Sequence, residues 1–274
     1  MLFCVRVDST DNLYLSKRYG MWPRIGTLPT YGVFYIIGFI LFFLIAFFIA
    51  RGFKLRHRVW IISGICYVIA MTIGAKILYD IQKSQFDFQA LFSMAHYTQG
   101  GLWGGLLAYF ILSLPLILLL SKRKREALDM IAISVPIPFS FTKLGCLFNG
   151  CCYGKPCELP WAITFPATSR IAPAGIPLHP TQIYEVLLML IITIFFITFR
   201  SKQWRGTKIL WFLVLYGFGR AIIEIFRGDF EHHRYIGPFS LSQLLCLAAA
   251  GISLFLVIAK FMLLRRSNLE ISQT

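Results

Sequence analysis

Long apolar runs separated by short basic segments form the main pattern of this chain. Seven runs approach the roughly 20 apolar residues that a helix needs to cross a bilayer. They cover about residues 32–50, 59–79, 100–120, 127–148, 183–199, 208–226 and 239–264. Because hydrocarbon offers an open backbone no hydrogen-bond partner, each run is expected to be helical. The pattern predicts an all-α integral membrane protein, a seven-transmembrane-helix bundle. It forms one polytopic domain over residues 1–274, with residues 1–31 as an N-terminal arm.

The fourth run, 127–148, is the least regular because Pro136, Pro138 and Lys143 interrupt it. A proline inside a membrane helix frees backbone carbonyl groups, which then need partners within the protein. We therefore expect this helix to be kinked and to face the interior of the bundle.

Lysine and arginine in the short loops predict the orientation. Four basic segments, 51–58, 121–125, 200–205 and 265–266, fall on one side of a seven-helix topology. Cytoplasmic loops carry an excess of these residues, so this side is predicted to be cytoplasmic. The N-terminus is then outside the cytoplasm, the C-terminus is inside, and the long polar loop 149–182 is outside.

The composition narrows the class of protein. Hydrophobic residues make up 57% of the 274 residues, and charged residues only 14%. Ordinary soluble domains carry about 25% charged residues, so this chain cannot coat a soluble globule of its size. The net charge of +15 is distributed between apolar runs rather than on a polar domain. This distribution favours anionic phospholipid over nucleic acid as the partner.

Ionisable residues inside the predicted membrane helices point to function, because a charge at membrane depth is costly. Arg220, Glu224 and Arg227 are four and three residues apart, so they share one face of the sixth helix. One interpretation is an Arg220–Glu224 pair that only fixes the bundle. The other, which we favour, is that Arg220 binds an anionic head group while Glu224 orients it.

Two further segments place polar groups at membrane depth. Lys143 lies a few residues inside the outer end of the fourth helix, where it either lines a site or extends to the interface. In LHPTQIYE, Pro180 suits the first position of a helix, which makes His179 its predicted N-cap. Tyr184 and Glu185 then enter the first turns. Such a helix start can serve an anion or a proton transfer, or it can be an ordinary helix end with interfacial anchors.

Four cysteines form a C-x4-C-C-x4-C array at the outer end of the fourth helix: Cys146, Cys151, Cys152 and Cys157. Zinc ligands usually come in close pairs a few residues apart, which this spacing does not match. Disulfide bonds are permitted outside the cytoplasm. A disulfide staple is therefore the first interpretation, a reactive thiol the second and a metal site the third.

Taken together, these motifs resemble those of the bacterial prolipoprotein diacylglyceryl transferase family. The similar segments are TLPTYGVFYIIGF (27–39), IGAK (73–76), QGGLWGG (99–105), KLGCLFNGCCYGKPCELPWAITFP (143–166), HPTQIYE (179–185) and YGFGRAIIEIFR (216–227). HPTQIYE is similar to the family motif almost letter for letter, and the last segment has the family's Arg-x3-Glu-x2-Arg spacing. Their order along a seven-helix map makes the resemblance specific.

The resemblance implies a membrane enzyme that transfers the diacylglyceryl group of phosphatidylglycerol to the lipobox cysteine that follows a prolipoprotein signal peptide. The products would be a thioether-linked lipid and glycerol phosphate, formed with no cofactor and no metal. The implied location is the bacterial cytoplasmic (inner) membrane, which the chain crosses several times. The implied catalytic residues, with the first two as phosphate clamps, are Arg220, Lys143, Glu224 and His179. The implied substrate-binding residues are Tyr31, Gln99, Asn149, Gly154, Tyr184, Glu185 and Arg227.

The chain departs from the family pattern at three places. Lys143 replaces an arginine and loses the planar fork of donors. Gln99 stands where the family often has histidine and cannot act as a base, so the identity of the general base stays open. The loop cysteines leave two other hypotheses. One is a related lipid-modifying transferase with another acceptor, and the other is a non-catalytic lipid-binding or thiol-redox membrane protein.

Overall fold

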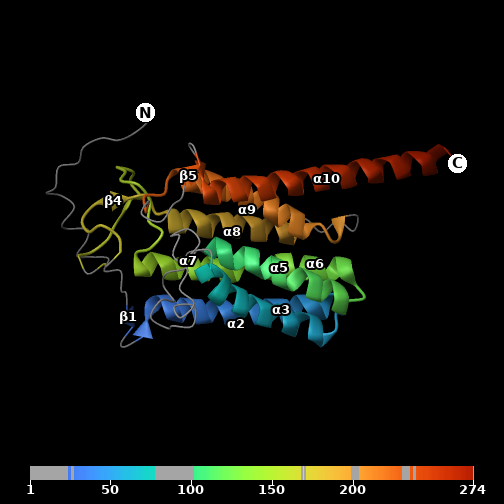
Figure 1. Ribbon diagram of the computed structural model, residues 1–274, viewed down its shortest axis with the longest axis horizontal. Helices are drawn as coiled ribbons and strands as arrows, with labels where there is room; N and C mark the ends of the chain where they lie inside the picture. The colour runs from blue at the N-terminus through green and yellow to red at the C-terminus, as the bar shows by residue number, and fades with distance from the viewer. Residues whose placement is uncertain are drawn as a thin grey trace.

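The helices of this protein run nearly parallel along the long axis of the molecule (Figure 1). The computed structural model describes residues 24–25, 28–77, 102–167, 169, 171–198, 204–229, 235–236 and 239–273. Three short hairpins lie at one end of the bundle, and the last helix projects beyond the other end (Figure 1). The long polar loop predicted from the sequence lies at the hairpin end.

The helices and strands of the described ranges have the following bounds. The helices are α2 (Thr30–Gly52), α3 (His57–Ile69), η1 (Ala70–Gly74, a π-helical segment), α5 (Leu102–Leu120), α6 (Lys124–Ser134), α7 (Pro136–Asn149), α8 (Thr181–Thr198), α9 (Lys208–Ile225) and α10 (Leu241–Gln273). The antiparallel hairpins are β1 (Arg24–Ile25) with β2 (Leu28–Pro29), β3 (Ile163–Thr164) with β4 (Pro177–Leu178), and β5 (Tyr235–Ile236) with β6 (Phe239–Ser240).

The outer surface of the bundle is apolar, which suits contact with lipid rather than with water. Five helices of the described ranges are long and apolar enough to cross a membrane: Thr30–Gly52, His57–Ile77, Lys124–Asn149, Thr181–Thr198 and Leu241–Leu263. Large apolar side chains point outward from them, with Phe48 65%, Ile191 61% and Phe255 69% exposed. Soluble monomers rarely expose large contiguous apolar surface. The chain is therefore a multi-pass, mostly helical integral membrane protein.

Two more helices belong to the same bundle. Gly104–Leu120 of α5 is apolar but shorter. α9 has 18 residues, yet it contains Lys208, Arg220 and Glu224. α9 packs against α8 and α10, and Arg220 and Glu224 are buried there. The charges of α9 therefore face other helices rather than lipid.

The fourth predicted helix is divided, as its prolines predict. α6 ends at Ser134 and α7 begins at Pro136, which has no backbone N–H to offer a helical hydrogen bond. α7 packs against both α2 and α8, and Pro138, Thr142 and Lys143 are buried. The predicted kink and the predicted inward-facing position are confirmed.

A glycine lets α9 and α10 approach closely. A β-carbon on Gly217 of α9 would lie 2.6 Å from the Cys246 carbonyl oxygen of α10. Small residues serve such contacts because membrane helices gain stability from close packing rather than from hydrophobic burial. The close approach fixes α10 against the helix that carries Arg220.

The start of α8 corrects one prediction. α8 begins at Thr181, and the Pro180 carbonyl oxygen accepts the first helical hydrogen bond from the Tyr184 N–H at 3.1 Å. Pro180 is therefore the cap residue, and the predicted N-cap role of His179 is wrong. The proline carbonyl is free to accept because only the N–H of a proline is missing.

Other helix ends differ or fall outside the description. α10 continues to Gln273, well past the predicted end at 264, because its last part extends beyond the bundle (Figure 1). Residues 78–101 lie outside the described ranges, and so do residues 1–23. The predicted site residue Gln99 is therefore one of which the structure describes nothing.

Candidate functional site

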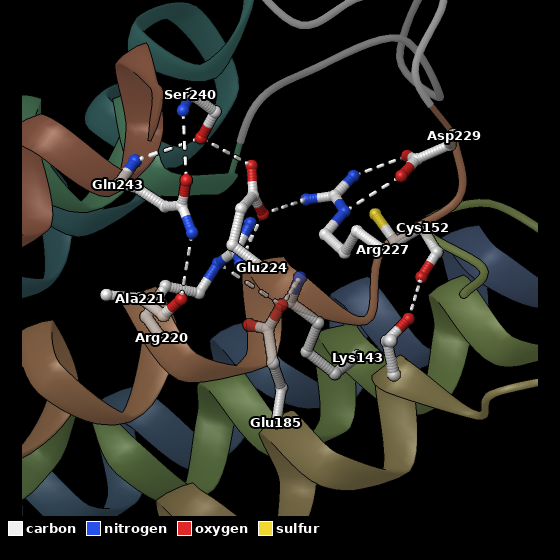
Figure 2. A network of polar contacts seen from close by, with 11 residues as sticks. Lys143, Cys152, Glu185, Arg220, Ala221, Glu224, Arg227, Asp229, Ser240 and Gln243 are labelled. Atoms are coloured by element: carbon white, nitrogen blue, oxygen red, sulfur yellow. Dashed lines mark hydrogen bonds and ion pairs between the residues drawn. The ribbon is translucent and has the colours of Figure 1, made fainter. Parts of the chain in front are cut away.

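Lys143 and Arg220, from different helices, meet at one oxygen atom. Lys143 Nζ of α7 donates to Glu185 Oε1 of α8 at 2.8 Å. Arg220 Nε of α9 lies 3.5 Å from the same oxygen (Figure 2). The three side chains are buried, with at most 5% of each exposed. Three helices thus bring two cations to a single anionic oxygen.

Arg220 also pairs with a second carboxylate. Its Nη1 atom lies 2.5 Å from Glu224 Oε2, one helical turn along α9. The other oxygen, Glu224 Oε1, accepts a hydrogen bond from Ser240 Oγ at 2.9 Å. Arg220 is therefore held between Glu185 and Glu224, which fixes the direction of its guanidinium group.

Arg227 extends the network toward the hairpin end. Its Nη1 lies 3.6 Å from Glu224 Oε2, and its Nε donates to Asp229 Oδ1 at 2.8 Å. Its Nη2 pairs with the second Asp229 oxygen (Figure 2). The predicted common face is confirmed for Arg220 and Glu224, whereas Arg227 lies two residues beyond the end of α9 and still contacts Glu224. The network contains three basic and three acidic side chains, so its formal charge is zero.

The start of α10 supports Glu224 through a reciprocal cap. Ser240 N–H donates to Gln243 Oε1 at 2.9 Å, and Gln243 N–H donates to Ser240 Oγ at 3.1 Å. Gln243 Nε2 also donates to the Ala221 carbonyl oxygen of α9 at 3.2 Å. This capping box fixes the Ser240 hydroxyl at the position from which it donates to Glu224.

Three cysteines converge beside the network. α7 ends in a Schellman turn in which Gly150 has φ +75°. The Gly150 N–H bonds to the Leu147 carbonyl oxygen, and the Cys151 N–H bonds to the Cys146 carbonyl oxygen. This turn brings residues five positions apart together. The Sγ atoms of Cys146, Cys151 and Cys152 lie within 4.8 Å of one another.

The cysteines correct the interpretation that the sequence favoured. All four loop cysteines are free thiols, so the structure contains no disulfide staple among them. Cys157 does not belong to the three-sulfur group; its N–H instead bonds to the Pro177 carbonyl oxygen at 3.0 Å. The staple was favoured from the predicted location outside the cytoplasm and the spacing, neither of which shows that a left-handed glycine folds the array into a cluster.

The backbone of the vicinal cysteines is fixed by the first turn of α8. Thr181 Oγ1 donates to the Cys152 carbonyl oxygen at 2.5 Å, and Gln182 Nε2 donates to the Cys151 carbonyl oxygen at 2.7 Å. Cys152 has φ +61°, a conformation that residues other than glycine seldom adopt. Such strain persists only where surrounding contacts enforce it, and it is concentrated at functional sites.

The electrostatic surroundings of Cys152 favour its ionised form. Hydrogen bonds from the two neighbouring cysteine thiols lower the pKa of the Cys152 thiol well below its ordinary value, against the opposing effect of burial. The positive charges of Lys143 and Arg227 act in the same direction. The cysteine cluster and the ion-pair network are thus electrostatically coupled.

Gly154 joins the long loop to the end of α9. Gly154 and Arg227 form an antiparallel β-bridge, and the Gly228 N–H donates to the Tyr153 carbonyl oxygen at 3.0 Å. The Gly154 N–H donates to the His179 carbonyl oxygen, also at 3.0 Å. The loop therefore holds Arg227 and the start of α8 in a fixed relation.

His179 and Tyr184 form a second group next to this junction. His179 Nδ1 and Tyr184 Oη are 3.1 Å apart, and Trp161 Nε1 donates to the same hydroxyl oxygen at 3.0 Å. Burial, and then the charge of Lys155, lower the pKa of His179 below its ordinary value. The imidazole is therefore mostly neutral at pH 7, with its Nδ1 atom within hydrogen-bond distance of the Tyr184 hydroxyl.

The remaining predicted residues lie around the cysteines. Tyr31 of α2 packs against Gly145 of α7, where a β-carbon would be 3.3 Å from the Tyr31 carbonyl oxygen. The side chain of Tyr31 lies near the three cysteines, and the Asn149 carboxamide lies beside Cys151. The structure thus brings Tyr31 and Asn149 to the same end of the bundle as the charged network.

Sequence reasoning missed several partners of the site. Asp229 could have been found as the acidic residue two positions after Arg227. Ser240 and Gln243 have the Ser-x-x-Gln spacing of a capping box, which also was visible. Trp161 entered the sequence prediction only as part of the segment 143–166 that resembles the family, and nothing in its spacing pointed to Tyr184.

Together, the fold and the site define the class of protein to which this chain belongs. A multi-pass helical bundle with a charge-balanced network buried at one end is typical of membrane proteins that act on a charged group at membrane depth. The family model described as "Prolipoprotein diacylglyceryl transferase" matches residues 23–259, which include the whole network. The chain belongs to this family of membrane transferases.

Individual relatives agree with the family match. The phosphatidylglycerol–prolipoprotein diacylglyceryl transferase of Clostridium tetani is 30% identical over 198 residues, 69% of this chain and 75% of that protein. Transferase 2 of the same kind from Clostridium perfringens is 30% identical over 218 residues, 76% of this chain and 78% of that protein. The Geobacter sulfurreducens transferase is 28% identical over 243 residues, 81% of this chain and 87% of that protein.

Proposed function

We propose that this protein transfers the diacylglyceryl group of phosphatidylglycerol to the lipobox cysteine thiol of a prolipoprotein. A thioether-linked lipid forms and glycerol phosphate is released. The observation that carries the proposal is the Glu185 oxygen on which Lys143 and Arg220 converge. In a member of this family, a phosphate oxygen is the anion that such a pair of cations would bind.

The chemistry requires cations at this place. The bond between the glycerol carbon and the phosphate oxygen breaks, and its electron pair leaves on the phosphate. Cations already in position in a buried site stabilise the growing charge without reorganising during the reaction. Arg220 offers two parallel donors to phosphate oxygens, and Lys143 offers a point charge. Glu185 keeps the two cations directed at a common point.

The neighbouring residues have supporting roles in this proposal. Glu224 orients Arg220, and Arg227, anchored by Asp229, binds the polar head of the lipid. Neutral His179, held by its hydrogen bond with Tyr184, accepts the proton that the acceptor thiol loses.

The residues around the cysteines would shape the other side of the site. Tyr31 and Asn149 lie next to the sulfur atoms, on the side where the acceptor thiol would arrive. Gly154 keeps the loop in place through its contact with His179. Gln99 keeps the substrate-binding role that the family resemblance implies.

We also propose seven membrane-spanning helices in the bacterial cytoplasmic membrane, with the N-terminus outside and the C-terminus inside. The basic segments support this orientation because their described residues lie at the end of the bundle opposite the network. Arg123 Nη1 donates to the Phe53 carbonyl oxygen at 3.2 Å, and Lys260 Nζ donates to the Arg205 carbonyl oxygen at 3.3 Å. Positive residues accumulate on the cytoplasmic side.

Reporter fusions test the orientation. Alkaline phosphatase, which is active only outside the cytoplasm, should be active when fused after Gly175 and inactive when fused after Ser121. The reverse activities would contradict the proposed topology.

Matched variants on one helix test the function. The purified protein is placed in nanodiscs that contain phosphatidylglycerol, and a lipobox peptide is added. Arg220→Gln should lower the rate of thioether formation by roughly a hundredfold or more, because a charge-stabilising donor is lost. Lys208→Gln, a similar change at the opposite end of α9, should stay within a few-fold of the wild type. Mass spectrometry of the peptide measures the product.

Other outcomes would contradict the proposal. Full turnover by Arg220→Gln would exclude the phosphate clamp. Diacylglyceryl transfer to a molecule other than the peptide would favour a related transferase with another acceptor. An absence of lipid turnover, with function lost only when the loop cysteines are replaced, would favour a thiol-redox protein.

A further inference from the structure

The three-sulfur group has the composition and size of a metal site. The Sγ atoms of Cys146, Cys151 and Cys152 lie within 4.8 Å of one another. Three thiolates that bind zinc at about 2.3 Å in tetrahedral geometry have sulfur–sulfur distances of about 3.8 Å. Shifts of less than about 1 Å would therefore bring the sulfurs into coordinating positions. Side-chain rotation alone can supply such shifts.

We propose that Cys146, Cys151 and Cys152 bind one thiophilic divalent cation, with zinc as the expected ion, and leave a fourth position open to an incoming thiol. Zinc sites with three protein ligands and one open position are typical of catalysis, whereas structural sites use four protein ligands. Cys157, the fourth cysteine of the loop, is not part of the group.

The backbone holds the three ligands ready. The Schellman turn at Gly150 sets Cys146 against Cys151. The first turn of α8 then fixes the carbonyl groups of Cys151 and Cys152 through hydrogen bonds from Thr181 and Gln182. A site whose ligands are fixed before the metal arrives loses little conformational entropy on binding. The left-handed conformation of Cys152 is then explained, because it directs the third sulfur toward the other two.

An unused hydrogen-bond donor provides independent support. Asn149 Nδ2 is buried and, in the described part of the chain, has no hydrogen-bond partner. The Asn149 side chain lies beside the Cys151 sulfur. A buried donor without an acceptor is destabilising, and a thiolate supplies the acceptor that a neutral thiol supplies poorly. Ligand sulfurs of metal sites are commonly supported by such outer donors.

Two cations lie beside the cluster and would offset the charge of a metal–thiolate complex. Zinc with three thiolates carries a net charge of −1. These cations are Lys143 and Arg227, whose charges both act on Cys152. Lys143 also precedes Cys146 by three residues, so it occupies the adjacent turn of α7. The complex would thus form beside the phosphate clamp, within reach of a substrate bound there.

This location suggests what the open position is for, and this part rests on the proposed function. The acceptor cysteine must lose its proton before it attacks, and a thiol bound to a metal is deprotonated. The proton passes to His179 when the thiol binds. The sulfur then forms the bond to the glycerol carbon as the carbon–oxygen bond to phosphate breaks. The electron pair of that bond leaves on glycerol phosphate. No redox change occurs.

Metal content tests the site independently of activity. Full-length protein is purified in detergent under reducing conditions, incubated with zinc, desalted and measured by plasma mass spectrometry. The wild type should retain about one zinc per chain. X-ray absorption should show three sulfur neighbours at about 2.3 Å. Cys151→Ser and Cys152→Ser should each lower zinc retention at least tenfold. Cys157→Ser, a matched change in the same loop, should retain zinc like the wild type.

The melting temperature of the same samples shows whether each variant is folded. Cys151 and Cys152 are only partly buried, so their serine variants should keep the melting temperature of the metal-free wild type. Cys146 is buried, so its replacement can destabilise the fold by itself. For Cys146→Ser, the informative quantity is therefore the rise in melting temperature when zinc is added to the variant. Absence of zinc from the reduced wild type would overturn the site. Equal loss of zinc in Cys157→Ser would overturn the assignment of the ligands.

Cobalt in place of zinc tests the open position. The lipobox peptide should shift the sulfur-to-cobalt absorption of the wild type, and a peptide with serine in place of its cysteine should not. No shift would overturn the open position. Full lipid transfer by chelated, zinc-free protein would overturn its role. Zinc bound as described, without any lipid transfer, would contradict the proposed function and leave the metal site standing.

Discussion

Gly154 and His179 are in direct backbone contact. The Gly154 N–H donates to the His179 carbonyl oxygen at 3.0 Å. A β-carbon on Gly154 would lie 2.4 Å from the His179 β-carbon and 2.5 Å from its carbonyl oxygen. It would also lie 2.8 Å from the Phe226 carbonyl oxygen at the end of α9. The loop can reach both helix ends only because this residue has no side chain.

Gly154→Ala should therefore separate the loop from α8 and α9. Three close neighbours, two of them backbone oxygens, cannot all move, so we expect a loss of about 1–3 kcal/mol in stability. Lipid transfer should fall with it, because Arg227 pairs with Gly154 through the backbone. The melting temperature in detergent measures the change. Gly251→Ala is the control, since nothing lies within 4 Å of a β-carbon there. An equal melting temperature for Gly154→Ala and the wild type would contradict the contact.

Glu185→Gln should destabilise the protein more than most single changes. It leaves Lys143 and Arg220 buried without the carboxylate that both contact. Removing one partner of a buried ion pair costs about 3–5 kcal/mol. Lys143→Met combined with Glu185→Gln should cost less than the sum of the single changes, because the two side chains interact directly. Additive changes in melting temperature would show that Lys143 and Glu185 are not coupled.

Asp229→Asn should affect lipid binding more than the chemical step. The Asp229 carboxylate contacts two nitrogen atoms of the Arg227 guanidinium group. The uncharged amide of an asparagine cannot form this ion pair. We expect the KM for phosphatidylglycerol to rise several-fold with a smaller change in kcat. The double variant with Arg227→Gln should be no worse than Arg227→Gln alone, because the two residues act as one unit. A fall in kcat at unchanged KM would assign Asp229 to the chemical step instead.

His179 should make stability depend on pH on the acidic side. Its pKa is lowered in the folded protein, so the unfolded chain binds the proton more readily. The stabilising contribution of the neutral ring is present above the unfolded value of about 6.5 and is lost as the pH falls through the folded value. The melting temperature of the wild type should drop more between pH 7 and pH 5 than that of His179→Gln. Identical pH profiles would show that His179 does not titrate between the two states.

Asp129 offers a change that should affect stability alone. Its Oδ1 accepts hydrogen bonds from the Gly206 N–H at 3.0 Å and the Lys208 N–H at 3.2 Å, at the start of α9. Loss of such a helix-start acceptor costs about 0.5–2 kcal/mol. Asp129→Ala should therefore lower the melting temperature while the folded protein keeps its kcat and its KM for the lipid. A raised KM would show that the two ends of α9 communicate.

Local spacing predicted the parts of the site that lie on one helix. The interval of four residues between Arg220 and Glu224 determines a common face, because an α-helix repeats every 3.6 residues, and Arg227 follows just beyond the helix end. The same reasoning predicted the kink at Pro136, since proline removes a backbone donor whatever its surroundings. These features depend on neighbours in sequence, and the sequence contains them.

Contacts between helices could not be predicted in the same way. Lys143 and Glu185 are 42 positions apart, and their meeting depends on how α7 and α8 are rotated against each other. The sequence shows that both are polar at membrane depth, but it does not show which partner each one finds. The cysteine cluster depends on a single left-handed glycine, Gly150, whose conformation only the fold reveals.

The zero formal charge of the ion-pair network has a consequence for turnover. Phosphatidylglycerol carries one negative charge, whereas glycerol phosphate carries nearly two at neutral pH because the second pKa of a phosphate monoester is about 6. A site with excess positive charge would hold this product more tightly than the substrate and would become inhibited by it. Because Glu185, Glu224 and Asp229 balance the three cations, direct contacts with Arg220 and Lys143 can stabilise the charge as it develops, while the network as a whole adds no excess attraction for the released product. We therefore expect the carboxylates that direct the cations also to limit inhibition by the leaving group.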